Sequence, residues 1–410
     1  MKKLGLLLGA VAMLGGLSAC EQVQKVAADA AGLPTDENVL FWTQDQRDNA
    51  FRQMEILTET RTISAGENTF DMADGKPLEL GEWDGEEGTS WNLTKYMQDQ
   101  RAAGIIILHN GKIRLEEYAL DHAADGRWTS FSVAKSFVST LVGAAIQDSY
   151  IKSLDDPLTD YIPELKGSGY DGVTVEQLLT MTSGVKWDED YEDPESDVAK
   201  FNQTKSQDGD NPILTYMATL EREAEPGTRW QYNTGETNLI GVLVSKATGK
   251  TLAEYLSEKV WAPFGMQMDG EWILNDGGFE IGGCCISAAL RDYALIGQFA
   301  VGGGTADGKQ VVPEDWFAKA GTKQADIGVP GKGYGYQWWT NDDGSYTARG
   351  IFGQSIFIDP KRQLVVATSG NWPKATDDRL GAERDTFFRT VQAAVDSEAP
   401  PMENAIMEGE

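Results

Sequence analysis

The hydrophobic and polar positions of the chain follow a strand-like period near both ends and a helical period in the middle. Residues 104–118, GIIILHNGKIRLEEY, form two β-rich runs around an Asn-Gly pair, which strongly favours a two-residue hairpin turn. Short strand-like runs return after residue 330, separated by Asp-Gly and Pro-Lys turn pairs. These later runs are YGYQWWT (334–340), GIFGQSIFID (350–359) and QLVVATSG (363–370).

Segments with a helical period lie between these two groups of strands. Residues 132–148 show the 3.6-residue repeat of a helix, and residues 173–184 show it up to a terminal glycine. A further helix is predicted over 237–249, where Gly249 provides the residue that commonly ends a helix. The middle of the chain is therefore predicted to be mostly helical.

This order of elements predicts an α/β architecture. We expect the terminal strands to share one antiparallel sheet flanked by helices, including a closing helix over 383–397, and we expect the middle helices to form a second lobe. The active site would lie between the two parts. We predict one domain over 46–397, a tether over 20–45 and a disordered acidic tail over 398–410.

The first twenty residues have the layout of an export signal. Two lysines precede an apolar run that is too short to cross a bilayer, so residues 1–19 are predicted to be a signal peptide. The sequence LSAC at its end resembles the bacterial lipoprotein box, which implies lipid attachment at Cys20. Since Glu21 follows rather than aspartate, we expect an outer-membrane anchor facing the periplasm. The alternative is an ordinary signal peptide, cleaved after a small residue.

Charge and composition narrow the classes of function. The 410 residues carry a formal net charge of −29, which would repel the phosphates of a nucleic acid. The chain has only two histidines and no paired cysteines at metal-binding spacing, so no metal site is expected. Adjacent cysteines bridge each other only with strained geometry, so Cys284 and Cys285 are predicted to be buried thiols.

A serine three residues before a lysine occurs at three places, and only one has a suitable context. Ser132 is predicted to open a long apolar helix, where free N–H groups and the positive end of the helix dipole favour an anion, with Lys135 on the same face. Ser149 comes at the opposite end of that helix. Ser183 is followed by Gly184, which would break the turn. Ser132 is therefore the candidate nucleophile.

A serine nucleophile needs a base, and lysine is favoured here. His109 and His122 lie in a predicted turn and in a polar loop, and no Gly-x-Ser-x-Gly elbow is present. Lysine can accept a proton near neutral pH when burial lowers its pKa. Lys135 lies among apolar residues, which suits this role.

Two further positions are candidates for the remaining steps of acyl transfer. Tyr232 stands between a Pro-Gly turn and a helix, from where its phenol could transfer protons. Gly350 and Gly353 lie in an apparent strand, where glycine lets a substrate approach the backbone and an N–H could complete an oxyanion hole.

Together these segments resemble the penicillin-recognising serine hydrolases, the class that contains class C β-lactamases, DD-peptidases and related esterases. The similarity covers about residues 100–395 and is greatest to the 6-aminohexanoate-dimer hydrolase group. It rests on SVAKSF, WDEDYEDP, QYNTGETNLIG, GGCCISAALRDYALIG and GIFGQSIFIDP. It implies a β-lactamase/transpeptidase-like fold in which Ser132 is acylated, Lys135 is the base and Tyr232 passes protons. It also implies an oxyanion hole from the N–H groups of Ser132 and Ile351, and closure of Tyr191 over the substrate.

Three positions depart from the patterns of these relatives. Tyr232 is followed by Asn-Thr rather than by the Ser-Asn of β-lactamases, and the Lys-Thr-Gly motif reads Ala348-Arg349-Gly350. Phe352 stands where the nylon-oligomer hydrolases carry histidine. Taken as a whole, the resemblance implies a hydrolase of small esters or amides that needs no cofactor. The alternatives are a DD-peptidase or weak β-lactamase and, in another class, a non-catalytic periplasmic binding lipoprotein.

Overall fold

The computed structural model describes residue 28, residues 32–34 and residues 39–398. The predicted signal peptide, the lipid-attachment residue Cys20 and the tail from residue 399 onward lie outside these residues, as does much of the predicted tether. Within the described residues, no helix combines the length and the hydropathy needed to span a bilayer.

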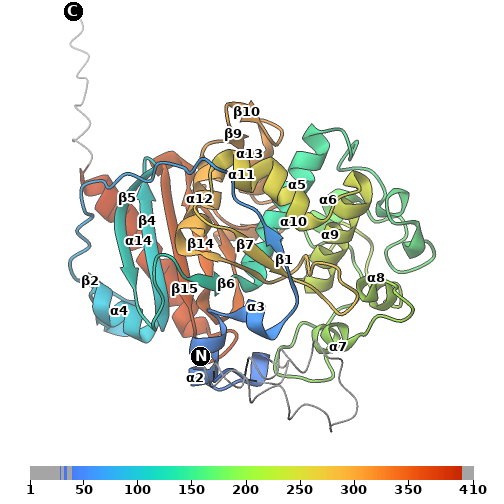
Figure 1. Cartoon of the computed structure of the whole chain (residues 1–410), viewed down its shortest axis with the longest axis horizontal. Helices are drawn as coiled ribbons and strands as arrows, with labels where there is room; N and C mark the ends of the chain where they lie inside the picture. Colours follow the sequence, from blue (N-terminus) through green and yellow to red (C-terminus); the bar gives the residue numbers. More distant parts are fainter. Residues whose placement is uncertain (1–27, 29–31, 35–38, 399–410) are drawn as a thin grey trace, which may run out of the picture.

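A seven-stranded antiparallel sheet joins the two ends of the domain (Figure 1). Its order is β11-β12-β13-β14-β15-β4-β5, so strand β15 from the C-terminal part pairs with β4 from the N-terminal part. The predicted sharing of one sheet by both ends of the chain is thus confirmed, and so is the Asn-Gly hairpin, in which His109 pairs with Lys112. The strands are β4 (Ala102–His109), β5 (Lys112–Tyr118), β11 (Lys332–Tyr334), β12 (Trp339–Asn341), β13 (Tyr346–Arg349), β14 (Ser355–Asp359) and β15 (Leu364–Gly370).

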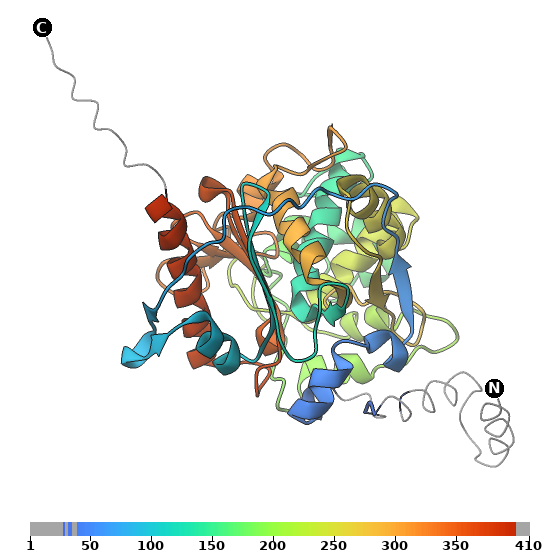
Figure 2. The ribbon, with the colours of Figure 1, turned by 60° about the vertical axis from the view of Figure 1, so that its left-hand side comes forward.

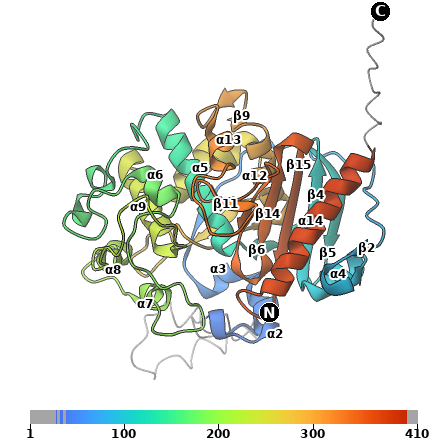
Figure 3. The ribbon, with the colours of Figure 1, turned by 180° about the vertical axis from the view of Figure 1, so that it is seen from behind.

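Helices cover both faces of this sheet (Figures 2 and 3). On β15, Leu364 and Val366 belong to the apolar cluster that contains the inner side of α14 (Asp378–Glu398). Val365 and Ala367 belong to the main core, together with α12 (Leu290–Val301). This alternation places successive side chains of one strand in two separate cores, as the pleat of a strand requires.

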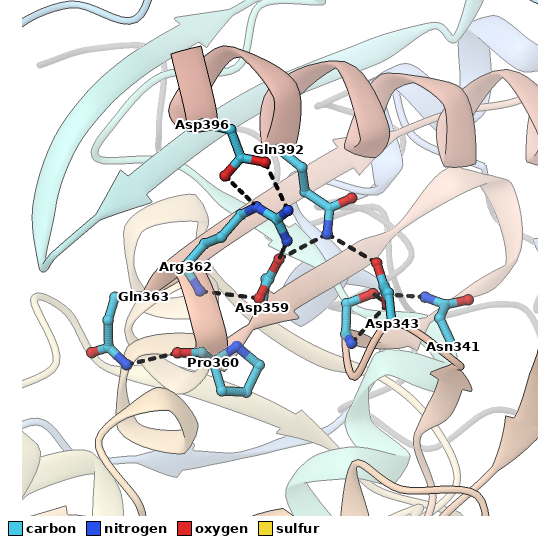
Figure 4. Close-up of polar contacts among 9 residues, drawn as sticks. Asn341, Asp343, Asp359, Pro360, Arg362, Gln363, Gln392 and Asp396 are labelled. Atoms are coloured by element: carbon cyan, nitrogen blue, oxygen red, sulfur yellow. Dashed lines mark hydrogen bonds and ion pairs between the residues drawn. The ribbon is translucent and has the colours of Figure 1, made fainter. Parts of the chain in front are cut away.

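Helix α14 begins earlier than the closing helix predicted over 383–397. Polar contacts attach its last turns to the end of β14 and to the residues that follow β12 and β14 (Figure 4). Arg362 forms ion pairs with Asp359 at 2.7 Å and with Asp396 at 2.8 Å. Gln392 donates hydrogen bonds to Asp359 at 2.7 Å and to Asp343 at 3.1 Å. The buried carboxylate of Asp359 is thereby paired, which offsets the cost of its burial.

The helical lobe packs on the other side of the domain and supplies the rest of the core (Figure 1). Its longest helix, α9, begins three residues earlier than predicted because the Asn233 side chain caps it by accepting from the Glu236 N–H at 3.1 Å. It ends as predicted, at Gly249 with φ of 71°. The helices of this lobe are α5 (Ala134–Gln147), α6 (Val175–Leu179), α7 (Asp197–Gln203), α8 (Pro212–Met217), α9 (Thr234–Thr248) and α10 (Leu252–Leu256).

Two predicted elements are shorter than their sequence pattern indicated. The helix expected over 173–184 ends at Leu179, because Met181 takes a φ of 54° that a helix does not allow. The strand expected over 334–340 is interrupted by a turn: Tyr334 ends β11 and Trp339 begins β12, with Gln337 at a φ of 64° between them.

A second sheet, of four antiparallel strands, lies beside the helical lobe and leads the chain into the candidate site. Its order is β1 (Thr60–Ile63), β7 (Gly270–Ile273), β8 (Ile286–Ala289) and β6 (Arg127–Thr129). The remaining α-helices and strands of the described residues are α2 (Gln44–Ala50), α3 (Met54–Leu57), α4 (Leu93–Asp99), α11 (Ala262–Phe264), α13 (Trp316–Ala320), β2 (Trp83–Asp84), β3 (Ser90–Trp91), β9 (Thr305–Ala306) and β10 (Lys309–Gln310).

Candidate active site

Ser132 lies in a tight turn between β6 and α5. The turn is the 3₁₀ helix η3 (Phe131–Val133), so Ser132 precedes the α-helix rather than opening it as predicted. The reason is the connection to the small sheet: the Ser130 N–H donates to the Ile286 carbonyl at 2.7 Å, and the Ser130 hydroxyl accepts from the Ile286 N–H at 2.9 Å. These contacts hold the chain on β8 until Phe131, whose φ of 45° redirects it into the helix.

Lys135 is buried directly beside the Ser132 hydroxyl. Its Nζ donates to Ser132 Oγ at 3.0 Å and to the Gly283 carbonyl at 2.5 Å, and the residue is only 2% exposed. Burial lowers the pKa of Lys135 to about 8, while the charge of Glu189 acts in the opposite direction. A substantial fraction of this amine is therefore uncharged in mildly alkaline solution.

Tyr232 lies close to the same two groups. Its ring centroid is 5.3 Å from Lys135 Nζ, and burial raises the pKa of its phenol above the ordinary value, against the effect of a hydrogen bond with the Ser132 hydroxyl. The ring stacks on Trp339 at a centroid distance of 5.6 Å and packs with Trp230 and Tyr334 in a separate apolar cluster. The structure thus brings Ser132, Lys135 and Tyr232 together, with an aromatic wall around the tyrosine.

Tyr191 reaches the site from the loop after α6. Its hydroxyl donates to Glu189 Oε1 at 2.6 Å, and its pKa is raised well above the ordinary value, first by burial and then by the charge of Glu189. Glu189 in turn accepts from the Thr234 N–H at 2.9 Å, at the start of α9. The loop of Tyr191 is thereby attached to the segment that carries Tyr232.

Ile351 follows β13 in the 3₁₀ turn η7 (Ile351–Gly353), not in a strand as the sequence pattern indicated. The residue before it needs to be glycine, because a Cβ on Gly350 would lie 2.5 Å from the Ser130 carbonyl oxygen. This close approach places the segment beside the turn of Ser132. The ring of Phe352 is buried 5.3 Å from that of Phe131, so it belongs to the apolar support under the turn.

The other candidates considered from the sequence lie in different surroundings. Ser149 is exposed at the far end of α5, while the buried Ser183 donates its hydroxyl hydrogen bond to Glu236. His122 is buried, and burial lowers its pKa to about 4, whereas His109 contacts Arg114 at 2.9 Å. None of these four residues contacts Ser132 in the described part of the chain.

The prediction of two free thiols is wrong. The structure joins Cys284 and Cys285 in a disulfide, with their Cα atoms 3.6 Å apart. Cys285 takes a φ of 78° at the end of the connection between β7 and β8. The pair directly follows Gly283, the residue whose carbonyl accepts from Lys135.

Two carboxyl groups near the site, one buried and one partly buried, were not found from the sequence. Glu236 is 1% exposed on α9, and burial raises its pKa to about 8. Glu189 lies in the acidic run after Trp187, where several neighbouring carboxylates gave no reason to select it. Among the described residues, no three His, Cys, Asp or Glu side chains come together as a group that could hold a metal ion.

Comparison with known proteins shows the family of the chain. A family model described as Beta-lactamase matches residues 92–270. A 6-aminohexanoate-dimer hydrolase from Paenarthrobacter ureafaciens is 31% identical over 322 residues, which are 75% of this chain and 82% of the relative. The chain belongs to the Beta-lactamase family. It is a serine hydrolase of that family, as its sequence indicated.

Solved structures support the fold of this Beta-lactamase family member. A candidate 6-aminohexanoate-dimer hydrolase from Bacillus anthracis has a TM-score of 0.78 at 22% identity and covers 90% of this chain and 100% of its own. A family VIII carboxylesterase has a TM-score of 0.56 at 18% identity, covering 72% of this chain and 95% of its own. The predicted β-lactamase/transpeptidase-like fold, with its antiparallel sheet and helical lobe, is confirmed.

Proposed function

We propose that this Beta-lactamase family hydrolase cleaves a small ester or amide through an acyl-serine intermediate on Ser132. The observation that carries the proposal is the 3.0 Å contact between the Ser132 hydroxyl and the amine of Lys135, which is 2% exposed. A buried lysine with a lowered pKa is a competent base for a hydroxyl in direct contact.

In the proposed mechanism, the neutral Lys135 amine accepts the Ser132 proton while Oγ attacks the substrate carbonyl carbon. The N–H groups of Ser132 and Ile351 would stabilise the resulting oxyanion, as the close packing of Gly350 against Ser130 supports. Tyr232, next to both Lys135 and Ser132, would pass the proton to the leaving group. Water then attacks the acyl-enzyme and releases the acid.

The nature of the substrate is also a proposal. The aromatic wall of Trp230, Tyr334 and Trp339 around Tyr232 supports an apolar portion of the substrate near the leaving group. The relatives named as 6-aminohexanoate-dimer hydrolase and carboxylesterase support amides and esters as the bonds cleaved. Ala348 replaces the lysine of the β-lactamase strand motif, and the neighbouring Arg349 is paired with Asp385 at 3.0 Å, so we place β-lactam hydrolysis second.

A substrate panel tests this function directly. Purified wild type and Ser132→Ala would be compared on p-nitrophenyl esters, short linear amides and a fluorescent penicillin, with mass spectrometry to detect an acyl adduct. Ester or amide turnover that needs Ser132 would support the proposal. Covalent labelling by penicillin without ester or amide turnover would favour a DD-peptidase or weak β-lactamase. If no substrate is turned over and a fluorophosphonate leaves Ser132 unmodified, the binding-lipoprotein alternative replaces the proposal.

The pH dependence of the reaction should reflect Lys135. Its pKa of about 8 means that the neutral base is scarce below that pH and abundant above it. We therefore expect kcat/KM for an ester to rise with pH through about 8, as measured by initial rates corrected for spontaneous hydrolysis. A profile that is flat between pH 6 and about pH 9 would contradict Lys135 as the base.

Replacing Tyr232 with phenylalanine should slow the reaction while preserving the stacked ring. We expect kcat to fall by about 10²-fold, because the phenol would no longer transfer a proton in the transition state. Tyr334→Phe is the matched control, since it removes a phenol from the neighbouring ring of the same cluster. Equal kinetics for the two variants would exclude the proposed role of Tyr232.

A further inference from the structure

The carboxylate of Glu189 accepts hydrogen bonds from donors in two segments of the chain. From its own loop, Tyr191 donates its hydroxyl hydrogen at 2.6 Å, and the Trp187 indole N–H also donates to it. From the start of α9, Thr234 donates both its backbone N–H, at 2.9 Å, and its hydroxyl hydrogen. Both carboxylate oxygens are therefore occupied, which leaves Glu189 poorly suited to act as a nucleophile or a base itself.

The same carboxylate is the charged neighbour of the reacting groups. Of the described residues, Glu189 is the charged group that acts on the Lys135 amine, whose direct hydrogen-bond partners are Ser132 Oγ and the Gly283 carbonyl. Its charge also acts on the phenols of Tyr232, Tyr334 and Tyr191 and on the buried carboxyl of Glu236. The negative charge of Glu189, which comes from the loop after α6, therefore favours the protonated form of the amine that α5 carries.

We propose that Glu189 is a positioning residue that fixes the 187–191 loop onto the start of α9 and holds a negative charge beside Lys135. This inference rests on the proposed acyl-Ser132 mechanism and adds to it a residue that does not touch the substrate. Tyr191 and Tyr232 come from different segments, and both depend on the position of the α9 start, which is two residues beyond Tyr232. The hydrogen bonds to Glu189 are what join these segments.

Replacing Glu189 with glutamine should change both the rate and its pH dependence. A glutamine offers one acceptor oxygen and would direct its amide N–H groups at donors, so the loop and α9 would lose part of their connection. We expect kcat/KM to fall by on the order of tenfold from misplacement of the site. Without the negative charge, the protonated amine of Lys135 is less favoured. The rise of kcat/KM with pH should therefore move to lower pH than in the wild type.

The experiment measures kcat, KM and full pH profiles for the wild type, Glu189→Gln, Glu189→Asp, Glu192→Gln and Ser132→Ala. Glu192 is the matched control, because it is an exposed carboxylate in the same loop, paired with Lys374 at 3.1 Å. We expect Glu192→Gln to behave as the wild type. Glu189→Asp keeps the charge, so its profile should stay close to that of the wild type even though its rate falls.

A folded Glu189→Gln enzyme with wild-type rate, or with an unmoved pH profile, would overturn the inference. If Ser132→Ala were as active as the wild type, the proposed function itself would fail, which separates the two results. If Glu189→Gln does not fold, Thr234→Val and Thr234→Ser give a second test, since only serine keeps the hydroxyl donor. A several-fold lower kcat/KM for the valine variant alone would support the proposal, and equal values would oppose it.

Discussion

Ser132→Ala is expected to lower kcat on any ester or amide substrate of this enzyme by at least about 10⁴-fold, the scale of loss found when a serine hydrolase loses its nucleophile. The change should leave folding intact, since it removes one oxygen from a residue that is 8% exposed. Circular dichroism and initial rates on the best ester of the panel would measure both effects. Fluorophosphonate labelling, read by intact mass, should disappear in parallel.

Ser149→Ala provides the matched control for this prediction. Ser149 stands in the same serine-to-lysine spacing, but it is exposed at the other end of α5. Its variant should retain wild-type kcat and full labelling. Loss of activity in the Ser149 variant together with retained activity in the Ser132 variant would show that the wrong serine has been assigned.

Lys135→Met is expected to inactivate the enzyme and to stabilise its fold. Without the amine, acylation should slow by about 10³-fold or more, because the Ser132 hydroxyl loses its base. Burial lowers the pKa of Lys135 from 10.5 to about 8. This shift means that burying the charged amine lowers the free energy of unfolding by roughly 3 kcal/mol. Methionine avoids this cost with a similar volume, although the hydrogen bonds to Ser132 and Gly283 are lost.

The sign of this effect determines its pH dependence. Below about pH 8 the amine is protonated in both states, and the full cost of burying the charge applies; above about 10.5 it is neutral in both. The free energy of unfolding of Lys135→Met should therefore exceed that of the wild type at pH 7, by up to about 3 kcal/mol. The difference should shrink as the pH rises from about 8 towards 10.5.

Denaturant unfolding at pH 7, 9 and about 10 would measure this difference. The exposed Lys152, from the second copy of the motif, is the control, and its methionine variant should change stability by no more than about 0.5 kcal/mol. A Lys135→Met protein that is less stable than the wild type at pH 7 would indicate that the lost hydrogen bonds outweigh the buried charge.

Elements whose ends depend on local chemistry were predictable from the sequence. The Asn-Gly pair between β4 and β5 needs only its own backbone preferences to form a hairpin, and Gly249 ends α9 because glycine accepts a positive φ. The early end of α6 and the turn at Gln337 were not predictable. Gln337 takes its positive φ where its N–H donates to the Leu179 carbonyl at 3.0 Å and its side chain accepts from the Thr237 hydroxyl at 2.7 Å. These partners are distant along the chain.

The residues of the candidate site also differ in whether the sequence alone could identify them. Ser132 and Lys135 are one turn apart, so their spacing and apolar context were enough to select them. Glu189 and the Gly283 carbonyl have no local signature, because their importance comes from which atoms they meet in space. The export signal and lipid attachment at Cys20 stay predictions from the sequence.

The residue pattern was thus sufficient for the class of fold, the hairpin, the long helices and the pair of groups proposed to start the reaction, since each depends on neighbours within about one or two turns. Tertiary structure decided the environment of Lys135, the turn that carries Ser132 and the attachment of the Tyr191 loop. The physical reason is that burial and charge are set by all atoms that surround a group, and residues distant in sequence supply most of them.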